Sequence, residues 1–253
     1  MRNDLVEPRR EGPVAFLTLS DPERANVLST AMMEALGEAL AAAAADETVR
    51  AIVLGAAGKV FCAGHDLAEL RATDDPAVHA ALFTRCGALM TAIAACRAPV
   101  IARVQGAAVA AGCQLVASCD LAYAATGARF AVSGVNLGLF CSTPGVALAR
   151  AVGARPALEM LLTGRFIDAE HAARLGLVNE AVAPERLDEA VLRAAELIAA
   201  KPPEAIGLGK RIFREQIQAP LDEAYAIAAA AMVENLGYPS ARAGIDAFLE
   251  GRR

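Results

Sequence analysis

Short apolar runs alternate with longer segments of helical periodicity over the first 140 residues of the chain. Apolar runs predict strands at residues 13–20, 50–56, 99–106, 121–125 and 129–132. Apolar residues recurring every three or four positions predict helices at residues 29–46 and 76–97. The run at 50–56 is apolar throughout, which is typical of a strand buried on both faces. Alternating strands and helices predict an α/β fold for this part of the chain.

The pattern becomes helical after Pro144. Helices are predicted at residues 145–153, 155–164, 168–176, 185–200, 203–217, 221–237 and 240–251. Glycines stand where residues that end a helix are expected, at Gly153, Gly164, Gly176 and Gly237. We therefore divide the chain into a core domain, residues 1–195, and a C-terminal helical region, residues 196–253. The last helices carry an apolar surface that favours packing on a neighbouring subunit.

Composition fits one large domain and excludes some partners. The chain has 253 residues, of which 56% are hydrophobic, so it can bury a sizeable core. The formal net charge is −5, which argues against nucleic acid as the main partner, because phosphate backbones are bound by basic patches. A small phosphorylated ligand needs only a few local Lys or Arg residues and stays compatible with this charge.

Cysteine usage and the N-terminus predict a cytoplasmic protein. The six cysteines form no CxxC pair and no Cys/His ligand spacing, so we expect reduced thiols and no metal site. The N-terminal residues contain no apolar segment of the kind found in secretory signals. The uncharged stretch at 104–119 is shorter than a bilayer span and contains Gln105 and Gln114, so no membrane partner is expected.

Two glycine-containing turns are the candidates for chemistry. The segments 59–70 and 104–115 each follow a predicted buried strand and place small residues where a helix starts. Backbone N–H groups at a helix start have no partner within the helix, and small side chains let a ligand oxygen approach them. Two such turns side by side can form an oxyanion hole from main-chain donors alone. The alternative is a pair of tight turns that need glycine only for their backbone conformation.

The motifs in these turns resemble those of the crotonase superfamily, the enoyl-CoA hydratase/isomerase family. "FCAGHDL" resembles the first oxyanion motif of that family and "VQGAAVAAGCQLVASCDLAYA" the second. "ARFAVSGVNLGLFCSTPGVALARAVG", "LTGRFIDAEHAARLGLVNEAV" and "GIDAFLEGRR" also fit, so the resemblance covers nearly the whole chain. Within the family, the chain is most similar to the subgroup of enoyl-CoA hydratase domain-containing proteins.

The resemblance implies a fold, a ligand and an assembly. The fold is a crotonase-like spiral of ββα units, followed by a C-terminal helical region used for trimerisation. The ligand is an acyl-CoA thioester, with coenzyme A as part of the substrate and no separate cofactor or metal. The expected assembly is a homotrimer or a dimer of trimers.

The resemblance also implies site residues. The two oxyanion N–H groups fall on Ala63 and Ala111, where they would stabilise a thioester enolate. The substrate-binding positions are Arg24, Ala25, Ala63, Gly64, His65, Asp66, Leu67, Ala111, Phe140, Phe248 and Arg252. Arg24 would contact a CoA phosphate, and Phe248 and Arg252 would close the CoA site of a neighbouring subunit. A surface arginine and a frayed basic tail are the alternatives for Arg24 and Arg252.

Both catalytic glutamates of the family's hydratases are replaced. They fall on Gln114 and Gly134, and neither residue can exchange a proton near neutral pH. General acid–base catalysis contributes about 10²–10⁴-fold per group, so we expect very weak hydration. One alternative is a decarboxylase of a malonyl-type CoA thioester, in which His65, helped by Ser133, holds the carboxylate. Another is a catalytically silent acyl-CoA-binding protein.

Overall fold

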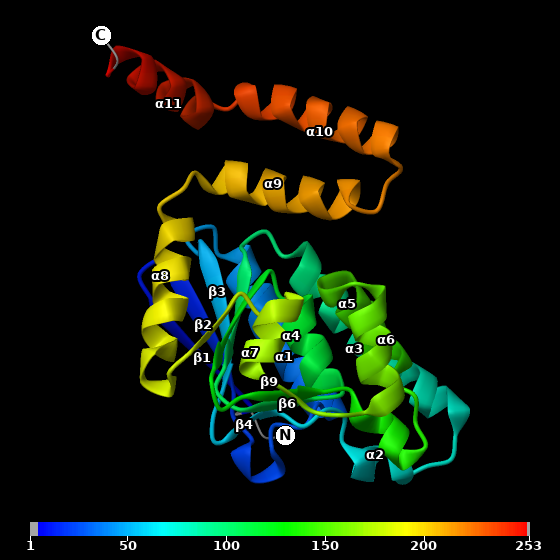
Figure 1. The fold of residues 1–253 in the computed structure, drawn as a ribbon. Helices are drawn as coiled ribbons and strands as arrows, with labels where there is room; N and C mark the ends of the chain where they lie inside the picture. The colour runs from blue at the N-terminus through cyan, green and yellow to red at the C-terminus, as the bar shows by residue number, and fades with distance from the viewer. Residues whose placement is uncertain (1–4, 252–253) are drawn as a thin grey trace.

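A computed structural model describes residues 5–251 and shows two β-sheets surrounded by helices (Figure 1). The six-stranded sheet has the order β1 (Val6–Glu11), β2 (Val14–Leu19), β3 (Ala51–Ala56), β5 (Val100–Val104), β7 (Leu121–Ala125) and β10 (Glu180–Val182). The four-stranded sheet has the order β4 (Val60–Cys62), β6 (Ala107–Val109), β8 (Arg129–Ala131) and β9 (Ile167–Asp168). Pairing is antiparallel between β1 and β2 and between β8 and β9, and parallel elsewhere.

Successive strands alternate between the two sheets. β3 is followed by β4, β5 by β6, and β7 by β8, with the first of each pair in the large sheet and the second in the small one. Helices follow each pair, so the chain repeats a strand–strand–helix unit. The predicted α/β spiral of ββα units is therefore confirmed.

The helices cover the sheets and extend beyond them at the C-terminal end of the chain. They are α1 (Thr30–Ala45), α2 (Leu67–Arg71), α3 (Pro76–Ala95), α4 (Ala111–Ser118), α5 (Ser142–Val152), α6 (Ala154–Thr163), α7 (Ala169–Leu175), α8 (Leu187–Ala199), α9 (Pro203–Gln216), α10 (Leu221–Leu236) and α11 (Pro239–Glu250). Short 3₁₀ turns lie at η1 (Pro22–Arg24), η2 (Ser133–Leu137) and η3 (Pro184–Arg186). In Figure 1, α9 and α10 run side by side above the sheets and α11 continues outward.

The buried core includes the predicted helix at 29–46 and the predicted buried strand at 50–56. Ser29 caps α1 by accepting a hydrogen bond from Met32 N at 3.1 Å, and Leu36 is buried on the inner face of that helix. All six residues of β3 are buried, because α1 and α3 cover one face of the large sheet and α8 covers the other. Val53 on β3 packs with Val191 on α8 in this second layer.

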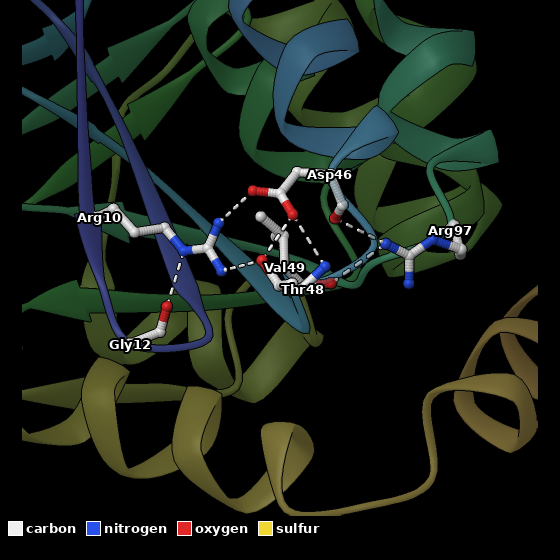
Figure 2. A network of polar contacts seen from close by, with 6 residues as sticks. All are labelled: Arg10, Gly12, Asp46, Thr48, Val49 and Arg97. Atoms are coloured by element: carbon white, nitrogen blue, oxygen red, sulfur yellow. Dashed lines mark hydrogen bonds and ion pairs between the residues drawn. The ribbon is translucent and has the colours of Figure 1, made fainter.

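A polar network ties the N-terminal hairpin to the loop before β3 (Figure 2). Arg10 on β1 bonds to the Asp46 carboxylate at 2.5 Å and to Thr48 Oγ1 at 2.8 Å. From the other side, Arg97 donates to the main-chain oxygens of Asp46 and Val49. Hydrogen bonds from Thr48 and Arg10 lower the Asp46 pKa to about 2.

An ion cluster docks α9 onto the strand ends. Lys210 Nζ lies 2.6 Å from Asp120 Oδ2, and Arg214 Nη2 lies 2.8 Å from Asp120 Oδ1. Asp120 also accepts the main-chain N–H of Val100, which starts β5. The predicted division between residues 195 and 196 falls inside α8 and stays a prediction.

One helix, α3, has the length and composition of a membrane span within residues 5–251. This is weak evidence for a membrane, because core helices of globular proteins pass the same test. One face of α3 is buried against the core through Leu82, Cys86, Leu89, Met90 and Ile93. The absence of a membrane partner stays a prediction.

Candidate active site

The two glycine-containing turns meet at the edge of the small sheet. A β-carbon at Gly64 would lie 3.3 Å from Ala111 N and 3.0 Å from Val109 O, so the first turn touches the start of α4. A β-carbon at Gly112 would lie 2.1 Å from Cys62 O, so the start of α4 also touches the end of β4. Both positions require glycine for close approach, and Gly64 also has φ of 96°.

The first predicted oxyanion donor is wrong. Ala63 N–H donates to Ala25 O at 3.0 Å, so it is already used within the fold. The structure gives no acceptor within residues 5–251 for the N–H groups of His65 and Ala111. The free donor of the first turn is therefore that of His65, two residues later and directly after Gly64, which contacts the second turn.

Ala110, directly before the second donor, has an unusual backbone conformation. Its φ is 50° and its ψ is −115°, a combination that residues with a β-carbon rarely adopt. Ala110 N donates to Ala131 O at 2.8 Å, which fixes the turn to β8. The chain changes direction at Ala110, so the Ala111 N–H no longer pairs within the sheet. As the first residue of α4, Ala111 also has no acceptor for this N–H within the helix.

Gln114 lies one turn into α4 with its side chain almost fully buried. Its amide oxygen accepts from the Cys86 thiol of α3, with 3.8 Å between Sγ and Oε1. Burial raises the pKa of Cys86 to about 11, so the thiol keeps its proton and acts as the donor. With its oxygen held by α3, the amide presents its N–H₂ group to other partners.

A groove of about 2010 Å³ lies between α3, α5 and α9, and Gln114 is one of its lining residues. Gln114 lines it together with Met90 of α3 and Ala147 of α5. Among the described residues, none of the other predicted site positions lines this groove. Apart from Gln114, the groove is therefore lined by other residues than those of the two oxyanion turns.

Gly134 has no room for the carboxylate that hydratases of the family carry. A β-carbon there would lie 2.5 Å from Leu139 O and 2.7 Å from Cys141 Sγ. The Cys141 thiol instead accepts the Gly134 N–H at 3.3 Å. The pKa of Cys113, the residue before Gln114, is raised to about 12 by burial and, to a smaller extent, by the nearby Cys141 thiol. The turn that contains Cys141 therefore lies beside α4. The sequence shows the missing side chain, and the structure shows that the local backbone excludes one.

The His65 side chain lies beside the oxyanion turn, between Leu28 and α3. Its Nδ1 lies 3.3 Å from Leu28 O, and its ring meets the Phe83 ring edge-on at 5.4 Å between centroids. Its Nε2 is buried and has no hydrogen-bond partner within the described part of the chain. Burial lowers the His65 pKa, more than the Leu28 carbonyl and the Glu69 carboxylate raise it.

The predicted phosphate contact, Arg24, is paired with acidic groups. It forms an ion pair with Asp66 and lies 3.9 Å from Asp21 Oδ2. Asp66 also caps α2 by accepting the N–H groups of Ala68 and Glu69. Burial would raise the Asp66 pKa, but these hydrogen bonds outweigh it and lower the pKa. Arg24 is half exposed, so a phosphate could reach it only in competition with Asp66.

Sequence reasoning missed Asn26, which holds the first turn in place. The side chain is fully buried, donating to Ala57 O at 2.9 Å and Val60 O at 2.8 Å and accepting from Asp21 N at 2.9 Å. It follows Ala25, and both residues have positive φ. An asparagine after a proline-containing turn was the available signal, since asparagine is enriched in such conformations.

The remaining predicted residues are spread around this centre. Ser133 begins η2, next to Gly134, and Leu67 begins α2. Phe140 lies in the loop before α5 and is 50% exposed. Phe248 lies on α11, and Arg252 lies outside the described residues. No group of three or more His, Cys, Asp or Glu side chains suited to a metal occurs in residues 5–251.

Comparisons with known proteins show the family of this chain. The family model for enoyl-CoA hydratase/isomerase matches residues 9–253. The chain is 43% identical to the rat enoyl-CoA hydratase domain-containing protein 3, mitochondrial, over 98% of this chain and 83% of the relative.

Solved structures give the same assignment. A Mycobacterium smegmatis enoyl-CoA hydratase has a TM-score of 0.96 and 54% identity, covering 98% of this chain and 97% of that one. The human enoyl-CoA hydratase domain-containing protein 3 has a TM-score of 0.95 and 42% identity, covering 98% of both chains. The predicted resemblance, including its subgroup, is confirmed. The chain belongs to the enoyl-CoA hydratase/isomerase family.

Proposed function

We propose that the protein binds acyl-CoA thioesters and stabilises the thioester enolate between the N–H groups of His65 and Ala111. The supporting observation is that two turns in contact each offer an N–H group without an acceptor in residues 5–251. Donors fixed in this way stabilise charge that develops on an oxygen, and losing one such donor typically costs about 3–4 kcal/mol. CoA enters as part of the substrate, and no separate cofactor is part of the proposal.

Hydration is a weak activity in this proposal. Gln114 cannot exchange a proton near neutral pH, and Gly134 has no side chain and no room for one. The site therefore lacks the two carboxylates that would act on a water, one as general base and the other as general acid. The enolate-stabilising part of the family's chemistry does not depend on them.

Binding of cinnamoyl-CoA tests the two donors directly. Polarising the thioester carbonyl extends charge along the conjugated system, so its absorption should move to longer wavelength on binding. The matched control is the cinnamyl thioether of CoA, which has no carbonyl and should bind without a shift. Failure of both compounds to bind, measured by calorimetry, would contradict the proposed function.

Decarboxylation of a malonyl-type thioester is a second candidate, because His65 lies beside the enolate site. It predicts CO₂ release from malonyl-CoA or methylmalonyl-CoA that His65→Ala abolishes. No CO₂ from either thioester would reject it. A protein that binds crotonyl-CoA and turns over no thioester in a broad panel would instead be a silent acyl-CoA-binding protein.

We also propose that the protein assembles into a trimer or a dimer of trimers through its C-terminal helices. Large apolar side chains on α10 recur along one stripe and are exposed: Leu221, Tyr225, Met232 and Leu236. Exposed apolar stripes of this kind mark interaction surfaces. A cytoplasmic location is carried forward as part of the same proposal, although the rat relative is named mitochondrial.

A further inference from the structure

We propose that His65 Nε2 is the proton acceptor of this site, taking a proton from the carbon next to the thioester carbonyl. The inference rests on the proposed function and names the group that performs its proton transfer. It starts from the two replaced glutamates, which leave the site without a carboxylate at either position. Enolate formation needs some other acceptor for the proton.

The protonation state of His65 follows from its hydrogen bond to Leu28. A carbonyl oxygen only accepts, so Nδ1 must carry the proton that points toward Leu28 O at 3.3 Å. In a neutral imidazole the other nitrogen then holds a lone pair. Nε2 is therefore an acceptor, and it has no donor within the described residues.

The position of the ring connects it with both halves of the site. His65 supplies one of the two free N–H groups, so its imidazole belongs to the same residue that would hold the thioester oxygen. The ring packs on Phe83, and Gln114 bonds to Cys86, three residues further along α3. Residues three apart share one face of a helix, so the imidazole and the amide are neighbours along α3.

The electrostatic surroundings favour a neutral imidazole. Burial lowers the His65 pKa, and the Glu69 carboxylate on α2 raises it by less. The nearby Asp66 carboxylate is paired with Arg24, and burial raises the pKa values of the Cys62 and Cys86 thiols to about 12 and about 11. A neutral lone pair suits proton removal better than it suits holding a substrate carboxylate, which needs a donor.

The proposed step is balanced without a co-reactant. The bond between the α-carbon and hydrogen breaks, and the proton moves to the Nε2 lone pair. The electron pair forms the enolate double bond, while the carbonyl π pair moves onto the oxygen held by the His65 and Ala111 N–H groups. Return of a proton from Nε2 regenerates the thioester. In D₂O the buried Nε2 proton exchanges when solvent enters the site between turnovers, so deuterium appears at the α-carbon.

Deuterium exchange into acetyl-CoA, butyryl-CoA and octanoyl-CoA, followed by mass spectrometry, tests the proposal. Saturated thioesters have α-hydrogens and no double bond to hydrate. We expect wild-type protein to catalyse exchange, and His65→Ala to lower the rate by about 10²–10⁴-fold. Added imidazole should restore exchange to His65→Ala and leave wild type unchanged. The wild-type rate should fall at low pH with a midpoint below 6.5, the ordinary His pKa.

His79→Gln is the matched control, because the His79 ring on α3 bonds to Leu70 O on α2 at 3.0 Å, and the substitution should leave exchange unchanged. Calorimetric binding of butyryl-CoA to wild type and variants separates two failures. Binding without exchange, or exchange equal in wild type and His65→Ala, would overturn the role of His65 and leave thioester binding intact. No binding by wild type would overturn the proposed function and this inference with it.

Discussion

Gly134 stands where hydratases of the family carry a glutamate, and its surroundings leave no room for a side chain. Adding a β-carbon would bring it within 2.5 Å of Leu139 O and 2.7 Å of Cys141 Sγ. The pair Gln114→Glu and Gly134→Glu would therefore not simply restore a hydratase. Before a carboxylate could act at position 134, the loop that contains Leu139 and Cys141 would have to move.

We expect Gly134→Ala to destabilise the protein by about 1–3 kcal/mol, as overpacking typically does. Urea unfolding monitored by circular dichroism measures the change. Gly127→Ala is the control, because a β-carbon there meets nothing within 4 Å and φ is not positive. Equal stabilities for the two variants would show that the Gly134 turn relaxes freely.

The second residue-scale prediction concerns Asp46, whose pKa is about 2. Thr48→Val removes the Thr48 hydroxyl from the carboxylate and should raise the Asp46 pKa toward the ordinary value of 3.8. The folded-state pKa is depressed, so the stabilisation by Asp46 is present above pH 3.8 and is lost as the pH falls through 2. NMR titration of the carboxyl carbon measures the shift. Thr91→Val, whose hydroxyl bonds to Gly87 O, should leave the titration unchanged.

The Ala111 N–H has no acceptor within residues 5–251, as its predicted role requires, and the role itself stays a prediction, whereas the Ala63 N–H is bonded within the fold. The difference depends on Ala25, whose carbonyl takes the Ala63 N–H. Ala25 reaches that position through φ of 53°, and alanine gives no sequence signal for such a conformation. A long-range backbone contact of this kind cannot be recognised from local pattern.

At the scale of elements, long periodic segments were predictable, whereas of the short or charged strands some, such as β8 (Arg129–Ala131), were predicted and others were missed. The pattern at residues 29–46 corresponds to α1 (Thr30–Ala45), and the apolar run at 50–56 to β3 (Ala51–Ala56). β1 was missed because "VEPRRE" has five exposed positions and a proline, which is tolerated on an edge strand. β4 and β6 have three residues each and depend on the second sheet for their pairing.

The docking of α9 gives a prediction at this scale. Asp120→Ala leaves the Lys210 ammonium buried without its carboxylate, which typically costs about 3–5 kcal/mol. Hydrogen exchange should rise in α9, and the urea midpoint should fall. Asp74→Ala removes an exposed partner of Arg71 and should change stability by at most about 1 kcal/mol. Unchanged exchange in α9 after Asp120→Ala would show that other contacts dock this helix.

The whole molecule presents an outer helical layer with exposed apolar side chains. Tyr225 and Met232 on α10 are 70% and 63% exposed. If this layer joins subunits, Tyr225→Glu with Met232→Glu should lower the assembly's mass toward that of one 26.1 kDa chain. Size-exclusion chromatography with light scattering measures the mass. Glu223→Gln, also on α10, should leave it unchanged, and a monomeric wild type would contradict the proposed assembly.

The contact between the two turns has a consequence for how this protein meets its ligand. Gly112 approaches Cys62 O too closely for any side chain, and Gly64 approaches Ala111 N, so neither turn can shift without displacing the other. The spacing of the two donor groups is then decided when the chain folds. The entropy of arranging them is lost before any encounter with a thioester, and association need not repeat that loss. The relative position of the two N–H groups is thus set by folding and does not depend on induced fit by the ligand.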